Sequence, residues 1–144
     1  MPPRNSELRR LVEARAGRCC EYCRSQLRYA TQPFSLEHIV PLARGGSSDA
    51  GNLALACQGC NNHKFTKVTG LDAASGATVP LYHPRRDRWR DHFAWNHDAT
   101  LVLGLTPSGR ATVEALQLNR AGLVTLRKVL YAAGVHPPPD VNAP

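Results

Sequence analysis

The stretch that decides the fold of this chain reads Phe34-Ser-Leu-Glu37-His38-Ile-Val-Pro41, followed by Asn52-Leu-Ala-Leu-Ala-Cys57-Gln-Gly-Cys60-Asn61-Asn62-His63-Lys64. It places a carboxylate beside a histidine, two asparagine amides at fixed offsets, and a Cys-x-x-Cys pair. A second pair, Cys20-Glu-Tyr-Cys23, lies upstream. Together these residue types can supply metal ligands and a general base within one small unit.

The two Cys-x-x-Cys pairs, Cys20/Cys23 and Cys57/Cys60, predict a structural zinc site. Four thiolates complete the tetrahedral coordination of zinc and leave no open position for a substrate. A redox pair or buried unpaired cysteines are the alternatives. Cys19 could replace Cys20 as a ligand, but we interpret it as a spare thiol.

Length, charge and hydropathy narrow the class of protein. The 144 residues predict one domain, and 18 Lys and Arg against 11 Asp and Glu give a formal net charge of +7. Such a surface attracts polyanions, of which nucleic acid is the commonest. The sequence shows neither an apolar run long enough to span a membrane nor a signal-peptide core. We therefore expect a cytoplasmic protein with no membrane partner, in which clustered cysteines bind metal and do not form disulfides.

The hydropathy pattern around the decisive stretch predicts a small ββα unit behind an N-terminal helix. Gly17 suits the end of that helix, and Pro41 would stop the first strand. The expected elements are a helix over 5–16, a strand over 34–40, a flexible loop over 43–51, a second strand or a tight turn over 53–57 and a short helix over 61–68.

The downstream half predicts a separate α/β extension on the same domain. We expect a loop over 71–78, a helix over 84–93, strands over 100–105 and 111–118 joined by a turn at 106–109, and a helix over 123–133. The fold class is therefore α+β, in one domain over 1–144 with a core at about 18–68. The extension would cover about 80–135 and a disordered, proline-rich tail 136–144.

Glu37 and His38 are the residues best suited to catalysis. Histidine has an unperturbed pKa near 6.5, so His38 can act as a general base at cellular pH. Glu37 and an amide oxygen are hard ligands that suit Mg²⁺ or Mn²⁺. A base and a divalent cation are what the hydrolysis of a phosphodiester needs.

Taken together, Glu37-His38-Ile-x-Pro41, Gly45-Gly46, Asn52-Leu and Cys57-x-x-Cys60-Asn61-x-x-Lys64 resemble the HNH endonuclease family, in its form with a four-cysteine zinc knuckle. The resemblance covers about a third of the chain and implies a ββα-metal (His-Me finger) core that holds one divalent ion. It implies that His38 is the general base, that Glu37 is a metal ligand, and that Asn52 braces the loop and orients His38. Asn61 would be the second metal ligand, with His63 as the alternative.

The resemblance also implies contacts with nucleic acid. Lys64 matches a position that is commonly basic in the family and could contact phosphate, and Lys67, Arg44, Arg85 and Arg86 are further candidates. Arginines interleaved with Trp89 and Trp95 could bind the phosphate backbone or stack on bases. A tryptophan core with a solvated arginine face explains the same pattern equally well.

We expect a metal-dependent DNA endonuclease, with Mg²⁺ or Mn²⁺ as the catalytic ion and Zn²⁺ as a structural one. The resemblance implies that it leaves 5′-phosphate and 3′-hydroxyl ends. The alternative is a zinc-stabilised nucleic-acid binding module without hydrolysis. One site cleaves one strand at a time, so a double-strand break would need a homodimer or two successive events.

Overall fold

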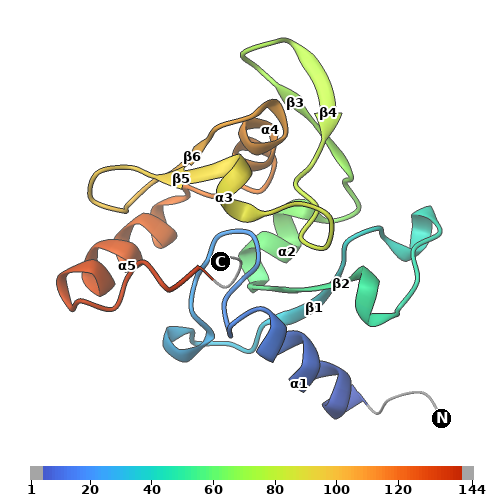
Figure 1. Ribbon diagram of the computed structural model, residues 1–144, viewed down its shortest axis with the longest axis horizontal. Coiled ribbons are helices and arrows are strands. Elements are labelled where there is room, and N and C mark those ends of the chain that lie inside the picture. Colours follow the sequence, from blue (N-terminus) through green and yellow to red (C-terminus); the bar gives the residue numbers. More distant parts are fainter. Residues whose placement is uncertain (1–4, 141–144) are drawn as a thin grey trace.

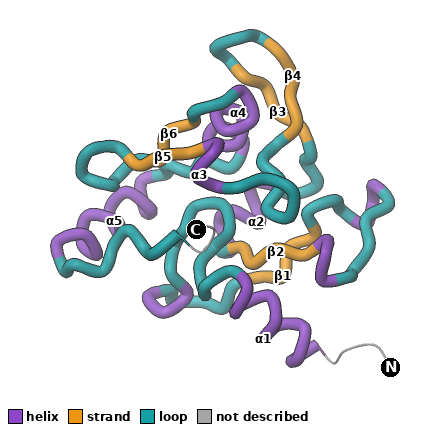
Figure 2. Tube along the Cα trace, viewed as in Figure 1, coloured by secondary structure: helices purple, strands orange, loops and turns teal. Residues whose placement is uncertain are grey.

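The computed structural model describes residues 5–140 and shows two groups of short elements packed on a shared core (Figure 1). The helices and strands are α1 (Asn5–Arg15), β1 (Ser35–His38), β2 (Leu53–Ala56), α2 (Gln58–Lys64), β3 (Thr69–Asp72), β4 (Ala77–Pro80), α3 (Trp89–His92), β5 (Phe93–Trp95), β6 (Val102–Gly104), α4 (Pro107–Ala115) and α5 (Ala121–Ala132). The strands form three separate antiparallel pairs, β1–β2, β3–β4 and β5–β6 (Figure 2). None of the described helices has the length and hydropathy needed to cross a membrane.

The predicted ββα unit is present as β1, β2 and α2. The two strands pair antiparallel, with Glu37 opposite Ala54 and His38 opposite Leu53. The helix begins at Gln58, three residues before the expected start, because the Cys57 sulfur accepts the Cys60 N–H and caps the first turn. Cys57 is therefore both the cap of α2 and a candidate metal ligand.

Helix α1 confirms the predicted N-terminal helix and packs against β2. Val12 is fully buried, and the Arg15 guanidinium donates to the carbonyls of Ala50 and Leu53 at 3.0 and 2.7 Å. Gly17 follows with a φ of 63°, the left-handed conformation that favours glycine at a helix end. This helix therefore closes the far side of the ββα unit.

The prediction of a loop over 71–78 is wrong, because these residues form most of the β3–β4 hairpin. The Asp72 carboxylate accepts the Ser75 hydroxyl at 2.7 Å and two bonds from the Arg110 guanidinium at 2.9 and 3.0 Å. Arg110 thereby holds the pKa of Asp72 well below its usual range. An ion pair between the buried Asp72 carboxylate and the partly exposed Arg110 of α4 fixes the turn.

Two further expectations in the extension are corrected. In place of the predicted strand over 111–118 and turn over 106–109, the structure has helix α4. Pro107 is its first residue, and the Thr106 hydroxyl caps its first turn. A Thr-Pro start is a helix signal that the β-branched residues downstream obscured. The helix over 84–93 is reduced to α3, because Arg86 and Asp87 N–H groups bond the His83 carbonyl in a turn.

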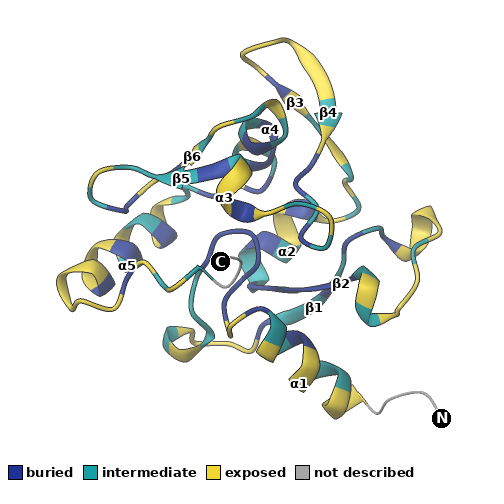
Figure 3. Ribbon diagram, in the orientation of Figure 1, coloured by how far each residue is buried: buried dark blue, intermediate teal, exposed yellow. Residues whose placement is uncertain are grey.

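The core is shared between the ββα unit and the extension (Figure 3). The Trp89 side chain is buried, and its indole N–H donates to the Tyr22 carbonyl at 2.9 Å. Residues 141–144 of the expected disordered tail lie outside the described residues. Within the described part, His136 is buried and donates to the Ala99 carbonyl at 2.8 Å, so the tail packs on the extension where it begins.

Candidate active site

The four cysteines of the two Cys-x-x-Cys pairs form one buried cluster. All the sulfur atoms of Cys20, Cys23, Cys57 and Cys60 lie within 4.8 Å of one another, and those of Cys23 and Cys57 are 3.6 Å apart. A tetrahedral zinc ion with bonds of about 2.3 Å needs sulfur–sulfur separations of about 3.8 Å. Cys19 lies outside the cluster and donates to the Gly17 carbonyl at 3.4 Å. The prediction that the two Cys-x-x-Cys pairs come together in one cluster, with Cys20 rather than Cys19, is confirmed.

The extension contributes a cation to this cluster that the sequence did not reveal. The Arg120 guanidinium, at the N-terminal end of α5, donates to the sulfurs of Cys57 and Cys60 at 3.3 and 3.5 Å. Four thiolates around Zn²⁺ leave a net charge of −2, which a guanidinium in contact with two sulfurs partly offsets. Arg120 is 60 residues from Cys60 in sequence, so no local spacing could indicate it.

His38 ends β1 and lines an open pocket of about 400 Å³. Its ring nitrogen Nε2 lies 3.0 Å from the Ser48 hydroxyl. Ser48 belongs to the Gly- and Ser-rich stretch that the sequence marked only as a loop, and no motif singled it out. The pocket is lined by Ser35, Leu36, Glu37, His38, Pro41, Leu42, Ala43, Asn61, Phe65 and Thr66.

Asn52 braces the chain that follows His38. Its amide oxygen accepts the Val40 N–H at 2.9 Å, and its amide nitrogen donates to the carbonyls of Val40 and Ser47 at 2.9 and 2.7 Å. Gly46 completes the brace, because a Cβ there would lie 1.7 Å from the Val40 oxygen. Asn52 thus holds together the two segments that carry His38 and Ser48.

Glu37 points away from its neighbour His38, as alternation along a strand requires. Its carboxylate is buried, accepting the Lys64 ammonium at 2.6 Å and the Tyr22 hydroxyl at 2.7 Å. Burial raises the pKa of Glu37, and the contacts with Lys64 and Tyr22 oppose that rise. The carboxylate is therefore held in a fixed position between two donors.

Lys64 does not present its charge to a phosphate, so that prediction is wrong. Only 1% of the residue is exposed, and its ammonium also donates to the Ile39 carbonyl at 2.8 Å. The last turn of α2 faces the β1 strand, which turns this lysine inward. Its charge is used to neutralise Glu37.

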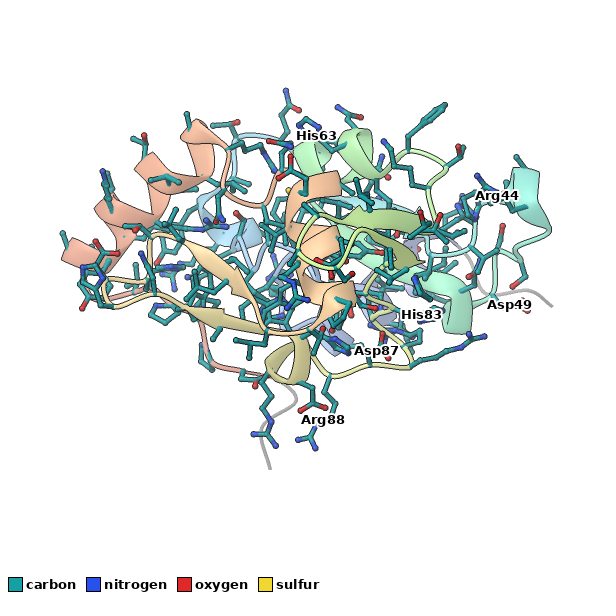
Figure 4. The ribbon with its side chains drawn as sticks, turned by 90° about the horizontal axis from the view of Figure 1, so that it is seen from above. Arg44, Asp49, His63, His83, Asp87 and Arg88 are labelled. Carbon is teal, nitrogen blue, oxygen red and sulfur yellow. The ribbon has the colours of Figure 1, made fainter. Side chains whose placement is uncertain are left out.

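Glu37 and Asn61 line the same pocket. A carboxylate has about four lone-pair sites, of which Lys64 and Tyr22 use two on Glu37. Among the described residues, no side chain bonds the Asn61 amide. These oxygen donors, with room for water, match the ligand type that Mg²⁺ or Mn²⁺ prefers. His63 does not line this pocket and lies at the surface of the molecule (Figure 4).

The predicted nucleic-acid contacts divide into exposed and internal groups. Arg44, Lys67 and Arg86 are exposed, and Figure 4 shows Arg44 at one edge of the molecule. Arg85 instead forms an ion pair with Glu21, and burial lowers the pKa of Arg85 to about 10. The prediction that Arg85 contacts nucleic acid fails because its charge is paired with Glu21. The Glu21 carboxylate is itself held in place by the Leu55 N–H.

Trp89 and Trp95 pack inside the molecule, as expected for the alternative of a tryptophan core. The Trp89 ring packs against Phe93 and Trp95, with ring centroids 5.1 and 5.5 Å apart, and Trp95 also contacts Arg127 and His136. Their stacking partners are therefore side chains of this chain.

Two histidines without an assigned role form a polar network with Asp87. The Asp87 carboxylate accepts the backbone N–H of His83 at 2.9 Å and lies 4.0 Å from His92 Nε2. The other ring nitrogen of His92, Nδ1, contacts the Thr106 hydroxyl at 2.6 Å. His83 and Asp87 lie side by side in Figure 4. The network ties the segment before α3 to the cap of α4.

The comparison with known families agrees with this geometry. The HNH endonuclease family model matches residues 20–67, which span both cysteine pairs, β1, β2 and α2. No curated protein and no solved structure matches the chain significantly. Residues 20–67 are therefore similar to the HNH endonuclease family, and the four-cysteine cluster is consistent with the zinc-knuckle type of that family.

Proposed function

We propose that this protein is a metal-dependent endonuclease that hydrolyses DNA phosphodiester bonds. The observation that carries the proposal is that His38, Glu37 and Asn61 line one open pocket within the segment that matches the HNH family model. A histidine supplies the base, and oxygen ligands supply the cation site that phosphodiester hydrolysis needs.

In this proposal His38 takes the proton from the attacking water. In the tautomer in which the Nε2–H donates to the Ser48 hydroxyl, the Nδ1 atom keeps its lone pair and is the basic nitrogen. Asn52 holds the segments on both sides of this contact and so fixes the ring relative to the pocket. Mg²⁺ or Mn²⁺, held by oxygens of Glu37 and Asn61, would stabilise the charge on the phosphate and on the departing 3′ oxygen.

The surface charge favours DNA as the substrate. The chain has a formal net charge of +7, and Arg44, Lys67 and Arg86 are exposed. Such cations bind the phosphate backbone without reading sequence, which predicts low sequence specificity and strong salt dependence. Release of the 3′ oxygen gives 5′-phosphate and 3′-hydroxyl ends.

One observation favours a second candidate, a zinc-stabilised nucleic-acid binding module without hydrolysis. Lys64 already neutralises Glu37, and a neutralised carboxylate attracts a divalent cation less strongly. In that case the basic surface would bind DNA while the pocket remained inactive.

The experiment that separates the two candidates is incubation of supercoiled plasmid with zinc-loaded protein in Mg²⁺, Mn²⁺ or EDTA. The nuclease proposal predicts metal-dependent nicked or linear DNA whose ends a ligase can rejoin without prior treatment. Linear product without a nicked intermediate would indicate two sites acting together, as in a homodimer. A plasmid that shifts in a gel but stays supercoiled in every metal would favour the binding module.

A further inference from the structure

Phe65 combines two unfavourable features at the end of α2. Its backbone has φ 50° and ψ −120°, a conformation that glycine adopts freely and a phenylalanine adopts at a cost. Its side chain is also 75% exposed, although phenylalanine is among the residues most often buried. Strain of this kind persists only where the surroundings impose it, and it gathers at functional sites.

The surroundings of Phe65 impose this conformation. The Phe65 N–H donates to the Asn61 carbonyl at 3.0 Å, and the Lys67 N–H donates to the Lys64 carbonyl at 2.9 Å. The Arg44 guanidinium holds the next residue, Thr66, through a 2.7 Å bond to its carbonyl. The chain is therefore held on both sides of the ring, and the ring is presented outward.

The exposed ring stands at the rim of the catalytic pocket. Phe65 lines the same pocket as His38 and Asn61, and Leu42, which is 61% exposed, lines it from the other segment. The Arg44–Thr66 bond ties these two segments together. Two apolar side chains thus flank the opening through which a phosphodiester would reach His38.

The charge around this rim identifies the occupant. Arg44 and Lys67 are both exposed cations within two residues of Leu42 and Phe65. An apolar pair between cations suits a polyanion that also offers apolar faces, and the stacked bases of DNA meet that description.

We propose that Phe65, supported by Leu42, is a wedge that inserts against the base stack of DNA beside the bond to be cleaved. The inference rests on the proposed function for the position of the scissile bond. Apolar wedges of this kind unstack a base step and bend the duplex, which opens the backbone to the protein. The backbone strain at position 65 is the cost of presenting the ring.

Three substitutions separate the ring from the strain. Phe65→Ala removes the ring and keeps the backbone conformation, Phe65→Gly removes both, and Phe65→Trp keeps an aromatic ring. We expect Ala and Gly to weaken DNA binding and to slow plasmid cleavage about five-fold or more, given the usual strength of base stacking on aromatic side chains. Gly, but not Ala, should also raise the Tm at fixed zinc concentration, and Trp should retain activity. Tyr131→Ala, which removes an exposed aromatic ring from α5, is the matched control and should change nothing.

Base unstacking is read directly with a DNA duplex that contains 2-aminopurine. The His38→Ala variant is used so that the duplex is not cleaved. Its binding should increase the 2-aminopurine fluorescence, and the double variant His38→Ala/Phe65→Ala should give no increase. If Phe65→Ala binds and cleaves DNA as well as the wild type, the wedge proposal is wrong and the nuclease proposal stands. The same holds if the protein forms a dimer without DNA and Phe65→Ala, but not the control variant, dissociates it. Brightening that depends on Phe65, with no cleavage by the wild type, would support the wedge and reject the nuclease.

Discussion

At the scale of single residues, the site depends on one buried ion pair. The side chains of Glu37 and Lys64 are 3% and 2% exposed, and Tyr22 gives the carboxylate a second donor. A buried pair of this kind adds little net stability as a whole, but losing one partner leaves an uncompensated charge in the core. The pair therefore fixes the position of Glu37 next to the pocket.

Lys64→Met should lower the free energy of unfolding by about 3–5 kcal/mol, because Glu37 would remain buried without its cation. Urea unfolding at fixed zinc concentration measures this effect. Lys67→Met is the matched control, because Lys67 is exposed, and it should stay within about 0.5 kcal/mol of wild type. Equal unfolding midpoints for the two variants would show that the Glu37–Lys64 pair is dispensable.

The sequence identified the chemistry of the site better than the direction in which side chains point. His38, Glu37 and Asn61 were expected to act together, and they do line one pocket. Lys64 and Arg85 were expected at the surface because lysine and arginine are seldom buried. Their acidic partners are 27 and 64 residues away, a distance over which a pattern of charges carries no contact information.

At the scale of elements, the cysteine cluster builds the ββα unit. The Cys57 sulfur caps α2, and the Glu21 N–H, between the ligands of the first knuckle, donates to the Leu55 carbonyl of β2 at 2.8 Å. The metal site thus joins the start of the helix to the central strand. The two strands that flank the cluster have only four residues each.

Removal of zinc should unfold this unit. Apparent zinc binding energies of about 10–16 kcal/mol equal or exceed the total stability of an ordinary domain. We expect one zinc per chain, and loss of helical circular dichroism when a strong chelator removes it or when Cys57→Ser is introduced. Cys19→Ser is the control, because Cys19 lies outside the cluster and that variant should keep its zinc. A fully folded, cooperative apo-protein would contradict the structural role.

The elements were predictable where local signals were strong. The cysteine knuckles and the prolines and glycines around β1 placed the ββα unit to within a few residues. The extension was harder, because the β3–β4 turn depends on Asp72 and Arg110, which are 38 residues apart. Helix α4 is hard to predict because its Thr106-Pro107 start is also typical of a turn between two strands.

At the scale of the whole molecule, the extension completes the core of the nuclease unit. Arg120 contacts the cysteine cluster, Arg85 pairs with Glu21, and the Trp89 indole bonds the Tyr22 carbonyl. Each of these links joins the extension to the first cysteine knuckle or to the second. The two halves should therefore unfold in one transition.

Arg120→Met should weaken zinc binding about 10- to 100-fold, as is usual when a group that contacts metal ligands is lost. Competition with a chromogenic chelator measures the affinity. Lys128→Met, an exposed position on the same helix, should leave the affinity unchanged. If both variants bind zinc as tightly as wild type, the extension does not support the metal site.

The most direct test of the central claim compares wild type with His38→Ala in single-turnover cleavage of supercoiled plasmid, at the best of Mg²⁺ and Mn²⁺. Both proteins must carry equal zinc and have the same circular dichroism, so that any difference reflects the pocket. The account predicts a loss of about 100-fold or more, the usual contribution of a general base. Cleavage by His38→Ala at the wild-type rate would contradict it.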